Sequence, residues 1–166
     1  MKKIIIVAIL ILVFSGLTFN TVKKMGSKEE EEIKKIAKKY GRKMAEDVEK
    51  IYRLETNHFT SRAYKATFAP GMQATAEKFP YGWTSFRPLW ADPSLKPTGL
   101  ITFNDNATGE PIRFIRFPSL GAAMESLVHF LKTRTLAEWN SKNEHAQNAY
   151  LGKLSQITPK ITNALT

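Results

Sequence analysis

Glu55 occupies a position where an amphipathic helix pattern calls for an apolar side chain. Met44, Val48, Ile51 and Glu55 are spaced four, three and four residues apart, so they share one stripe of a helix. An acid at the edge of an apolar wall loses hydration, which raises its pKa, and the negative end of the helix acts in the same direction. A carboxyl group with a raised pKa suits general acid catalysis near neutral pH. The alternative is that the helix ends before Glu55 and leaves it in water.

A second carboxylate near Glu55 would extend this chemistry. Asp105 and Glu110 are the candidates, because both lie in the turn-rich stretch NDNATGE between two strand-like runs. A hairpin loop at that place can hang over a cleft opposite Glu55. Both residue types are also common turn formers, so a purely structural role remains the alternative for each.

The elements that must position these acids follow from the spacing of apolar residues. From Ile33 to Leu54 the apolar residues recur at helical intervals, and Gly41 divides the pattern into two pieces. Between residues 60 and 98, prolines alternate with aromatic residues, which predicts short helices and turns. The runs 98–103 and 111–117 predict a β-hairpin.

The second half of the chain is mainly helical by the same criteria. Residues 118–134 predict a helix that Ser119 caps, and the tail from Thr135 has a weaker helical pattern. The fold class predicted from the sequence is therefore α+β, mostly α, with one small hairpin.

The N-terminal segment predicts a membrane anchor. Residues 4–22 carry no charge and lie between Lys3 and Lys23; as a helix of about 28 Å they would span a hydrocarbon core. A cleaved signal peptide is the alternative, although SGLTFN offers only a weak cleavage site. We divide the chain into an anchor (1–24), a linker with a basic helix (25–40) and a catalytic domain (41–166).

Composition restricts the chemistry further. The chain has no cysteine, which excludes disulfides, thiolate metal sites and cysteine nucleophiles. Its formal net charge of +10 suits a polyanionic partner, but no Arg-rich run or RNA-binding motif favours a specific nucleic acid. The histidines His58, His129 and His145 lack metal-ligand spacing, so we expect neither a metal nor another cofactor.

Three segments, in order, resemble the lysozyme superfamily. The stretch ETNHFTS (55–61) resembles the region around its catalytic glutamate, and PGMQA (70–74) resembles the Met-Gln motif of lytic transglycosylases. The hairpin followed by IRFPSLGAAMESLVHFL (115–131) looks more like the bacterial glucosaminidase family of the flagellar-muramidase type. The chain departs from these families at residues 57–59, where glucosaminidases carry Gly-Trp-Gly, and at Gly71, where transglycosylases carry Leu.

The resemblance implies a lysozyme-like fold and cleavage of the β-1,4 glycan strand of peptidoglycan. Glu55 would protonate the glycosidic oxygen, and Asp105 or Glu110 would assist if water ends the reaction; a lytic transglycosylase needs no second acid. The residues that the resemblance and the aromatic content place at the substrate are Thr56, Gln73, Tyr81, Trp83 and Tyr150.

Such an enzyme would act at a membrane that faces a cell wall. Its expected partners are peptidoglycan, the membrane through residues 4–22, and other envelope or virion proteins. The same plan fits a bacterial wall-remodelling enzyme and a lytic protein in the membrane of a lipid-containing phage. The alternative function is a non-catalytic, membrane-anchored protein that binds glycan or serves in a virion.

Overall fold

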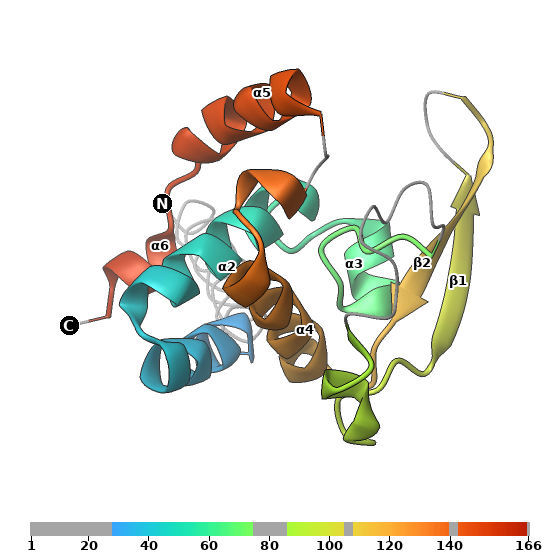
Figure 1. Cartoon of the computed structure of the whole chain (residues 1–166), viewed down its shortest axis with the longest axis horizontal. Coiled ribbons are helices and arrows are strands. Elements are labelled where there is room, and N and C mark those ends of the chain that lie inside the picture. Colours follow the sequence, from blue (N-terminus) through green and yellow to red (C-terminus); the bar gives the residue numbers. More distant parts are fainter. Residues whose placement is uncertain (1–27, 75–85, 105–107, 140–142, 166) are drawn as a thin grey trace, which may run out of the picture.

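The computed structural model describes residues 28–74, 86–104, 108–139 and 143–165 (Figure 1). The described part is mostly helical with one two-stranded antiparallel sheet, which confirms the predicted α+β class. A helix over residues 28–40 comes first. The further elements are α2 (Arg42–Glu55), α3 (Arg62–Thr67), β1 (Gly99–Asn104), β2 (Pro111–Arg116), α4 (Leu120–Thr133), α5 (Glu144–Ser155) and α6 (Lys160–Asn163), with short 3-10 helices at Leu89–Ala91 and Ala137–Trp139.

The predicted anchor at residues 4–22 lies outside the described residues, as do residues 25–27 of the predicted linker. Within the described part, no helix has the length and apolar character that crossing a bilayer requires.

Two hydrophobic cores meet at α4. Leu120, Met124 and Leu127 of α4 pack with Val48 and Ile51 of α2 in the first core. Ala122, Ala123 and Phe130, on another side of α4, pack with residues beneath the hairpin, including Ile115 and Phe117. Burying a side chain of this size contributes roughly 1.5–3 kcal/mol, so α4 fixes both halves of the molecule to one another.

The helix over residues 28–40 joins the first core instead of standing apart from it. Ile33 and Ile36 are buried there at 0% and 3% exposure. Gly41, at φ +92°, separates this helix from α2, as its position in the pattern predicts. By packing, therefore, the basic helix belongs with the residues that follow Gly41.

The hairpin and the segment before it form one edge of the molecule. β1 pairs with β2 in register from Gly99 opposite Arg116 to Asn104 opposite Pro111. On the other side of β2, Gln73 makes an antiparallel bridge to Phe114, and the Ile115 amide donates to the Met72 carbonyl at 2.8 Å. In Figure 1, α3 lies between α2 and this hairpin. The segment from Ala69 to Ala74 therefore leads from the end of α3 to the sheet.

Candidate active site

Glu55 is the last residue of α2 and continues the buried stripe of Val48 and Ile51. Its side chain is partly buried. Burial raises the pKa of Glu55 above its ordinary value of 4.5, while the Tyr150 hydroxyl and the charge of Lys153 pull that pKa down less strongly. The carboxyl group therefore holds its proton to higher pH than an exposed glutamate does, as its register on the helix predicts.

Tyr150 approaches Glu55 from α5. The ring is 4% exposed, and burial together with the neighbouring Glu55 raises the pKa of Tyr150 far above its ordinary range. Its hydroxyl thus stays protonated and acts as a donor. The hydroxyl lowers the pKa of Glu55, yet among the described residues no hydrogen bond to it meets normal distance and angle limits. The Tyr150 hydroxyl and the Glu55 carboxyl group are therefore neighbours without a well-formed hydrogen bond between them.

Lys153 is a part of this site that the sequence patterns did not single out. It lies one turn after Tyr150 on α5, its side chain is exposed, and its charge favours the ionised form of Glu55. A spacing of three residues from a candidate tyrosine is the signal that points to it.

The backbone at Gly71 forms another wall of the site. A Cβ at Gly71 would lie 3.4 Å from Glu55 Oε2, so the chain passes directly beside the carboxyl group. Gly71 has φ +75°, a conformation that strains residues with side chains. Two residues later, Gln73 bridges to Phe114, and its side-chain oxygen is buried without a hydrogen-bond partner among the described residues. Gln73 is thus near the site, but no measured contact joins it to Glu55.

An unusual turn follows Glu55. Asn57, His58 and Phe59 have φ values of +48°, +56° and +68°, three successive left-handed residues that are not glycine. Each such residue costs on the order of 1 kcal/mol, and such strain is concentrated at functional sites. The ring of Phe59 stacks on Tyr52 at 5.7 Å between centroids, and the His58 amide donates to the Arg53 carbonyl at 2.8 Å. The packing of Phe59 therefore holds a strained turn directly after the candidate acid.

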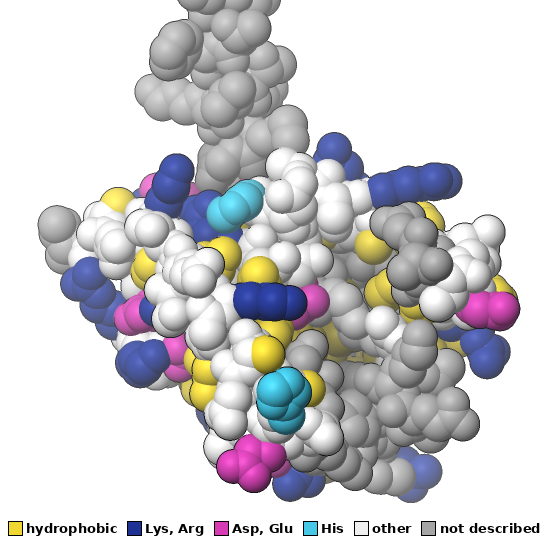
Figure 2. All heavy atoms as spheres, turned by 90° about the horizontal axis from the view of Figure 1, so that it is seen from above, with side chains coloured by type: hydrophobic (Ala, Val, Ile, Leu, Met, Phe, Trp, Pro, Cys, Tyr) yellow, Lys and Arg dark blue, Asp and Glu magenta, His cyan; other side chains and the backbone are white. Residues whose placement is uncertain are grey.

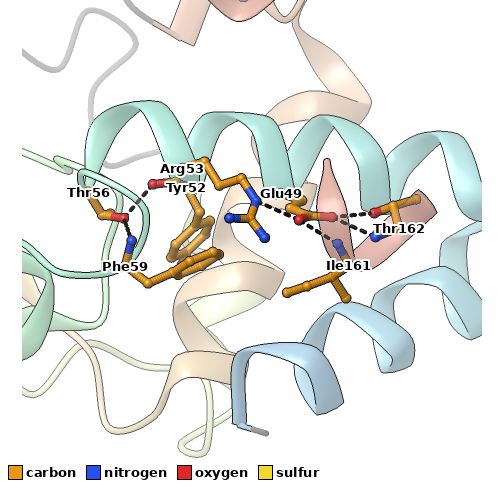
Figure 3. A network of polar contacts seen from close by, with 7 residues as sticks. All are labelled: Glu49, Tyr52, Arg53, Thr56, Phe59, Ile161 and Thr162. Carbon is orange, nitrogen blue, oxygen red and sulfur yellow. Dashed lines mark hydrogen bonds and ion pairs between the residues drawn. The ribbon is translucent and has the colours of Figure 1, made fainter. Parts of the chain in front are cut away.

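Thr56 belongs to this turn. Its hydroxyl donates to the Tyr52 carbonyl and accepts from the Phe59 amide at 2.8 Å, and the residue is 1% exposed (Figure 3). The contact between Thr56 and a sugar stays a prediction, and in this structure the hydroxyl is bonded within the turn and covered. Its role is to end α2 and to support the left-handed turn.

The most deeply buried acid of α2 is Glu49, which the sequence patterns did not indicate. It is 0% exposed, and Arg53 Nε donates to its carboxylate at 2.6 Å. The amides of Ile161 and Thr162 donate to it at 2.8 and 2.7 Å, and the Thr162 hydroxyl donates at 2.8 Å (Figure 3). Glu49 therefore fixes the C-terminal helix α6 to α2, and its paired oxygens are unsuited to proton transfer.

The other predicted site residues are separated from Glu55 or undescribed. Glu110 is exposed in the loop between β1 and β2, where its amide donates to the Thr108 hydroxyl at 3.3 Å. Asp105, Tyr81 and Trp83 lie outside the described residues. Around Glu55 the described residues thus bring together one acid, one tyrosine and one lysine.

The surface around these elements is basic without one concentrated patch. Figure 2 shows Lys and Arg side chains dispersed over the face it presents, with hydrophobic side chains visible in a hollow between them. Several lysines are paired with acids, such as Lys39 with Glu125 and Lys43 with Asp47. In the described ranges, no group of three or more histidine or acidic side chains is arranged to hold a metal ion.

Comparisons of the chain with protein-family models, with curated proteins and with solved structures give no match. The site is therefore interpreted from its own geometry.

Proposed function

We propose that this protein cleaves the β-1,4 glycan strand of peptidoglycan, with Glu55 as the general acid. The observation that carries the proposal is the surroundings of Glu55: a partly buried carboxyl group with a raised pKa at the end of a helix, beside a tyrosine hydroxyl that lacks a well-formed hydrogen bond. The proposed fold is lysozyme-like.

The reaction begins with proton transfer from Glu55 to the glycosidic oxygen as the bond to the sugar breaks. General acid catalysis of this kind contributes about 10²–10⁴-fold to the rate. The carboxylate that Glu55 becomes after giving up its proton then stabilises the developing oxocarbenium ion. The neighbouring Tyr150 hydroxyl lowers the pKa of Glu55 and so eases the loss of the Glu55 proton.

The second step has two forms. In a hydrolase, water adds to the sugar and gives up a proton to a carboxylate; in a lytic transglycosylase, the 6-hydroxyl of the muramyl residue closes an anhydro ring and returns its proton to Glu55. A single acid suffices for the second form. For the first form, the predicted second acid Glu110 is exposed on the hairpin loop. The site belongs, in this proposal, to a membrane-anchored enzyme that faces a cell wall, either in a bacterial envelope or in a phage membrane.

The test is a digestion of purified peptidoglycan by the full chain in mild detergent, with the Glu55→Gln variant beside it. Glutamine keeps the size of the side chain and removes the proton. We expect released muropeptides from the wild type and a loss of about 10²–10⁴-fold in the variant. Mass spectrometry separates anhydro products of a transglycosylase from the reducing ends of a hydrolase. Equal activity of the two proteins, or no products from a folded wild type, would contradict the proposal.

A further inference from the structure

A cavity separates the start of α3 from the inner face of the hairpin. Its volume is about 640 Å³. We call it the Arg62 groove and define it by its lining residues: Ser61, Arg62, Ala63, Thr102, Phe103, Asn104, Ile112 and Phe114. One wall is thus the first turn of α3, and the other is a strip of both strands. The groove is large enough for several residues of an extended peptide.

The chemistry of the groove combines one cation with an aromatic floor. Among the described residues that line it, Arg62 is the one charged residue, and its guanidinium group lies 5.4 Å from the centroid of the Phe103 ring. Phe103 packs edge to face with Phe114 at 5.9 Å. Among the described residues, no carboxylate forms a salt bridge with the exposed Arg62. The groove therefore offers an ordered guanidinium group to a carboxylate from outside the chain.

The groove also lies within reach of Glu55. Gly71 borders the Glu55 carboxyl group, and Gln73 pairs with Phe114, which lines the groove. Two extended residues span at most about 7 Å, and paired strands lie about 4.8 Å apart. The backbone of Phe114 is therefore within roughly 17 Å of the acid once the 3.4 Å between a Cβ at Gly71 and Glu55 Oε2 is included, a distance that an extended peptide of about five residues covers.

We propose that the Arg62 groove binds the acidic peptide stem that muramic acid residues carry in peptidoglycan. Arg62 pairs with a stem carboxylate, and the rings of Phe103 and Phe114 cover its apolar part. This inference rests on the proposed function, since it assigns the substrate of that site as a glycan strand that still bears its peptides. A neutral sugar would gain little from the guanidinium group, and a strand without stems would leave the groove empty.

The first experiment compares two substrates with the full-length protein. One is uncrosslinked glycan strands with peptide stems, and the other is the same strands after an amidase has removed the stems. We expect kcat/KM to be on the order of ten-fold higher for the strands with stems, about the effect of one charge-assisted hydrogen bond. Arg62→Gln should remove this preference and leave the rate on stripped strands unchanged. Equal rates on both substrates in the wild type would overturn the inference.

Lys65→Gln is the matched control, because Lys65 is an exposed cation on the same helix that does not line the groove. We expect it to keep the preference for stems. If Lys65→Gln lost as much of the preference for stems as Arg62→Gln, that preference would come from general attraction by a basic surface. If Arg62→Gln lowered kcat/KM equally on both substrates, Arg62 would bind the glycan or support the fold, and the inference would be wrong.

A second measurement separates the groove from catalysis. The free tripeptide L-alanyl-γ-D-glutamyl-diaminopimelate is titrated into isotope-labelled protein, and NMR shifts are followed. We expect shifts at Ser61–Ala63 and Thr102–Asn104, and their loss in Arg62→Gln. A protein that cleaves neither substrate but shows these shifts would contradict the proposed function and keep the peptide site. Cleavage without the shifts would overturn the peptide site alone.

Discussion

Glu49 and Glu55 are two acids on the same helix whose surroundings differ in kind. Glu49 is fully buried, and four donors from Arg53, Ile161 and Thr162 surround it. Glu55 is less buried, yet burial raises its pKa because few donors compensate for the lost water. Its tyrosine neighbour has a buried hydroxyl with no hydrogen bond of normal geometry among the described residues.

The difference shows that depth of burial does not identify a reactive acid. A carboxylate with all its partners in place is part of the structure, because protonating it would break several hydrogen bonds at once. A carboxyl group that has lost water without gaining donors keeps its proton to higher pH, so it still has a proton to transfer near neutral pH. The number of compensating donors therefore separates the structural end of α2 from the candidate catalytic end.

The largest expected effect on stability comes from Glu49→Gln. This change removes the negative charge that pairs with Arg53. It also replaces a carboxylate oxygen, which accepts hydrogen bonds, by an amide nitrogen, which donates them, in a group that the Thr162 amide faces. We expect a loss of about 3–5 kcal/mol in the free energy of unfolding, with activity per folded molecule retained. Urea denaturation measures it.

Glu46→Gln is the matched control for that prediction, since Glu46 pairs with Lys50 on the same helix at 2.7 Å. We expect a loss below about 1 kcal/mol from this partly exposed pair. A stable but inactive Glu49→Gln variant would reverse the roles of the two acids in our comparison.

The second prediction concerns pH. Because the pKa of Glu55 is raised in the folded protein, its protonated form is the one that folding favours. The stabilising contribution of Glu55 is therefore complete below its ordinary pKa of 4.5 and is lost as pH rises through the folded value. We expect Glu55→Gln to be more stable than the wild type at neutral pH and the two to converge on acidification. Activity of the wild type should fall over the same rise in pH, as an acid loses its proton.

Denaturation curves from pH 4 to pH 8 measure this difference. Glu46→Gln supplies a control of opposite sign, because the hydrogen bond from Lys50 lowers the pKa of Glu46. Its loss of stability relative to the wild type should be greatest at neutral pH and should shrink on acidification. A difference between Glu55→Gln and wild type that does not change with pH would show that Glu55 ionises like an exposed glutamate.

The sequence predicts most of the fold because its signals are local. The two strand-like runs predict the hairpin correctly. Gly41 marks the start of α2, and Ser119 marks the start of α4, where its hydroxyl accepts from the Ala122 amide at 3.1 Å. The inward register of Glu55 follows from the same periodicity. The two cores around α4 depend on packing between distant segments, which a pattern in one window does not contain.

The site is less predictable because its partners come from elsewhere in the chain. Tyr150 was one of two tyrosine candidates, and only the packing of α5 brings it to Glu55. Glu49 resembles any charged helix residue in the sequence, since its partners Ile161 and Thr162 lie at the other end of the chain. The turn bonds of Thr56 are not visible in the sequence, because a threonine after a helix serves a turn as readily as a ligand.

The third prediction tests the two groups that favour the ionised form of Glu55. Tyr150→Phe removes the hydroxyl and should raise the pKa of Glu55, moving the alkaline limb of the activity profile to higher pH. Lys153→Gln should move it in the same direction by less, because its charge acts through solvent. Stability should change little in Tyr150→Phe, as the lost hydroxyl has no well-formed bond.

Lys160→Gln is the control for these variants, since Lys160 is an exposed cation on α6 that does not shift the pKa of Glu55. Its pH profile should match that of the wild type. An alkaline limb that moves to lower pH in Tyr150→Phe would mean that the hydroxyl stabilises the protonated acid instead.

The last prediction, with the smallest expected shift of the pH profile, separates backbone strain from the site itself. Gly71→Ala and Gly109→Ala both place a side chain at a positive φ, +75° and +73°, so each should cost about 1–2 kcal/mol in the free energy of unfolding. The methyl group at position 71 meets Glu55, at 3.4 Å from Oε2, whereas a methyl group at position 109 has, beyond its chain neighbours, no atom of the described residues within 4 Å. The added methyl group removes further water from the carboxyl group, so Gly71→Ala alone should move the alkaline limb of activity to higher pH. If both variants shifted the profile equally, or neither did, the close approach of Gly71 would have no part in setting the ionisation of Glu55, and the contrast with Glu49 would rest on Tyr150 alone.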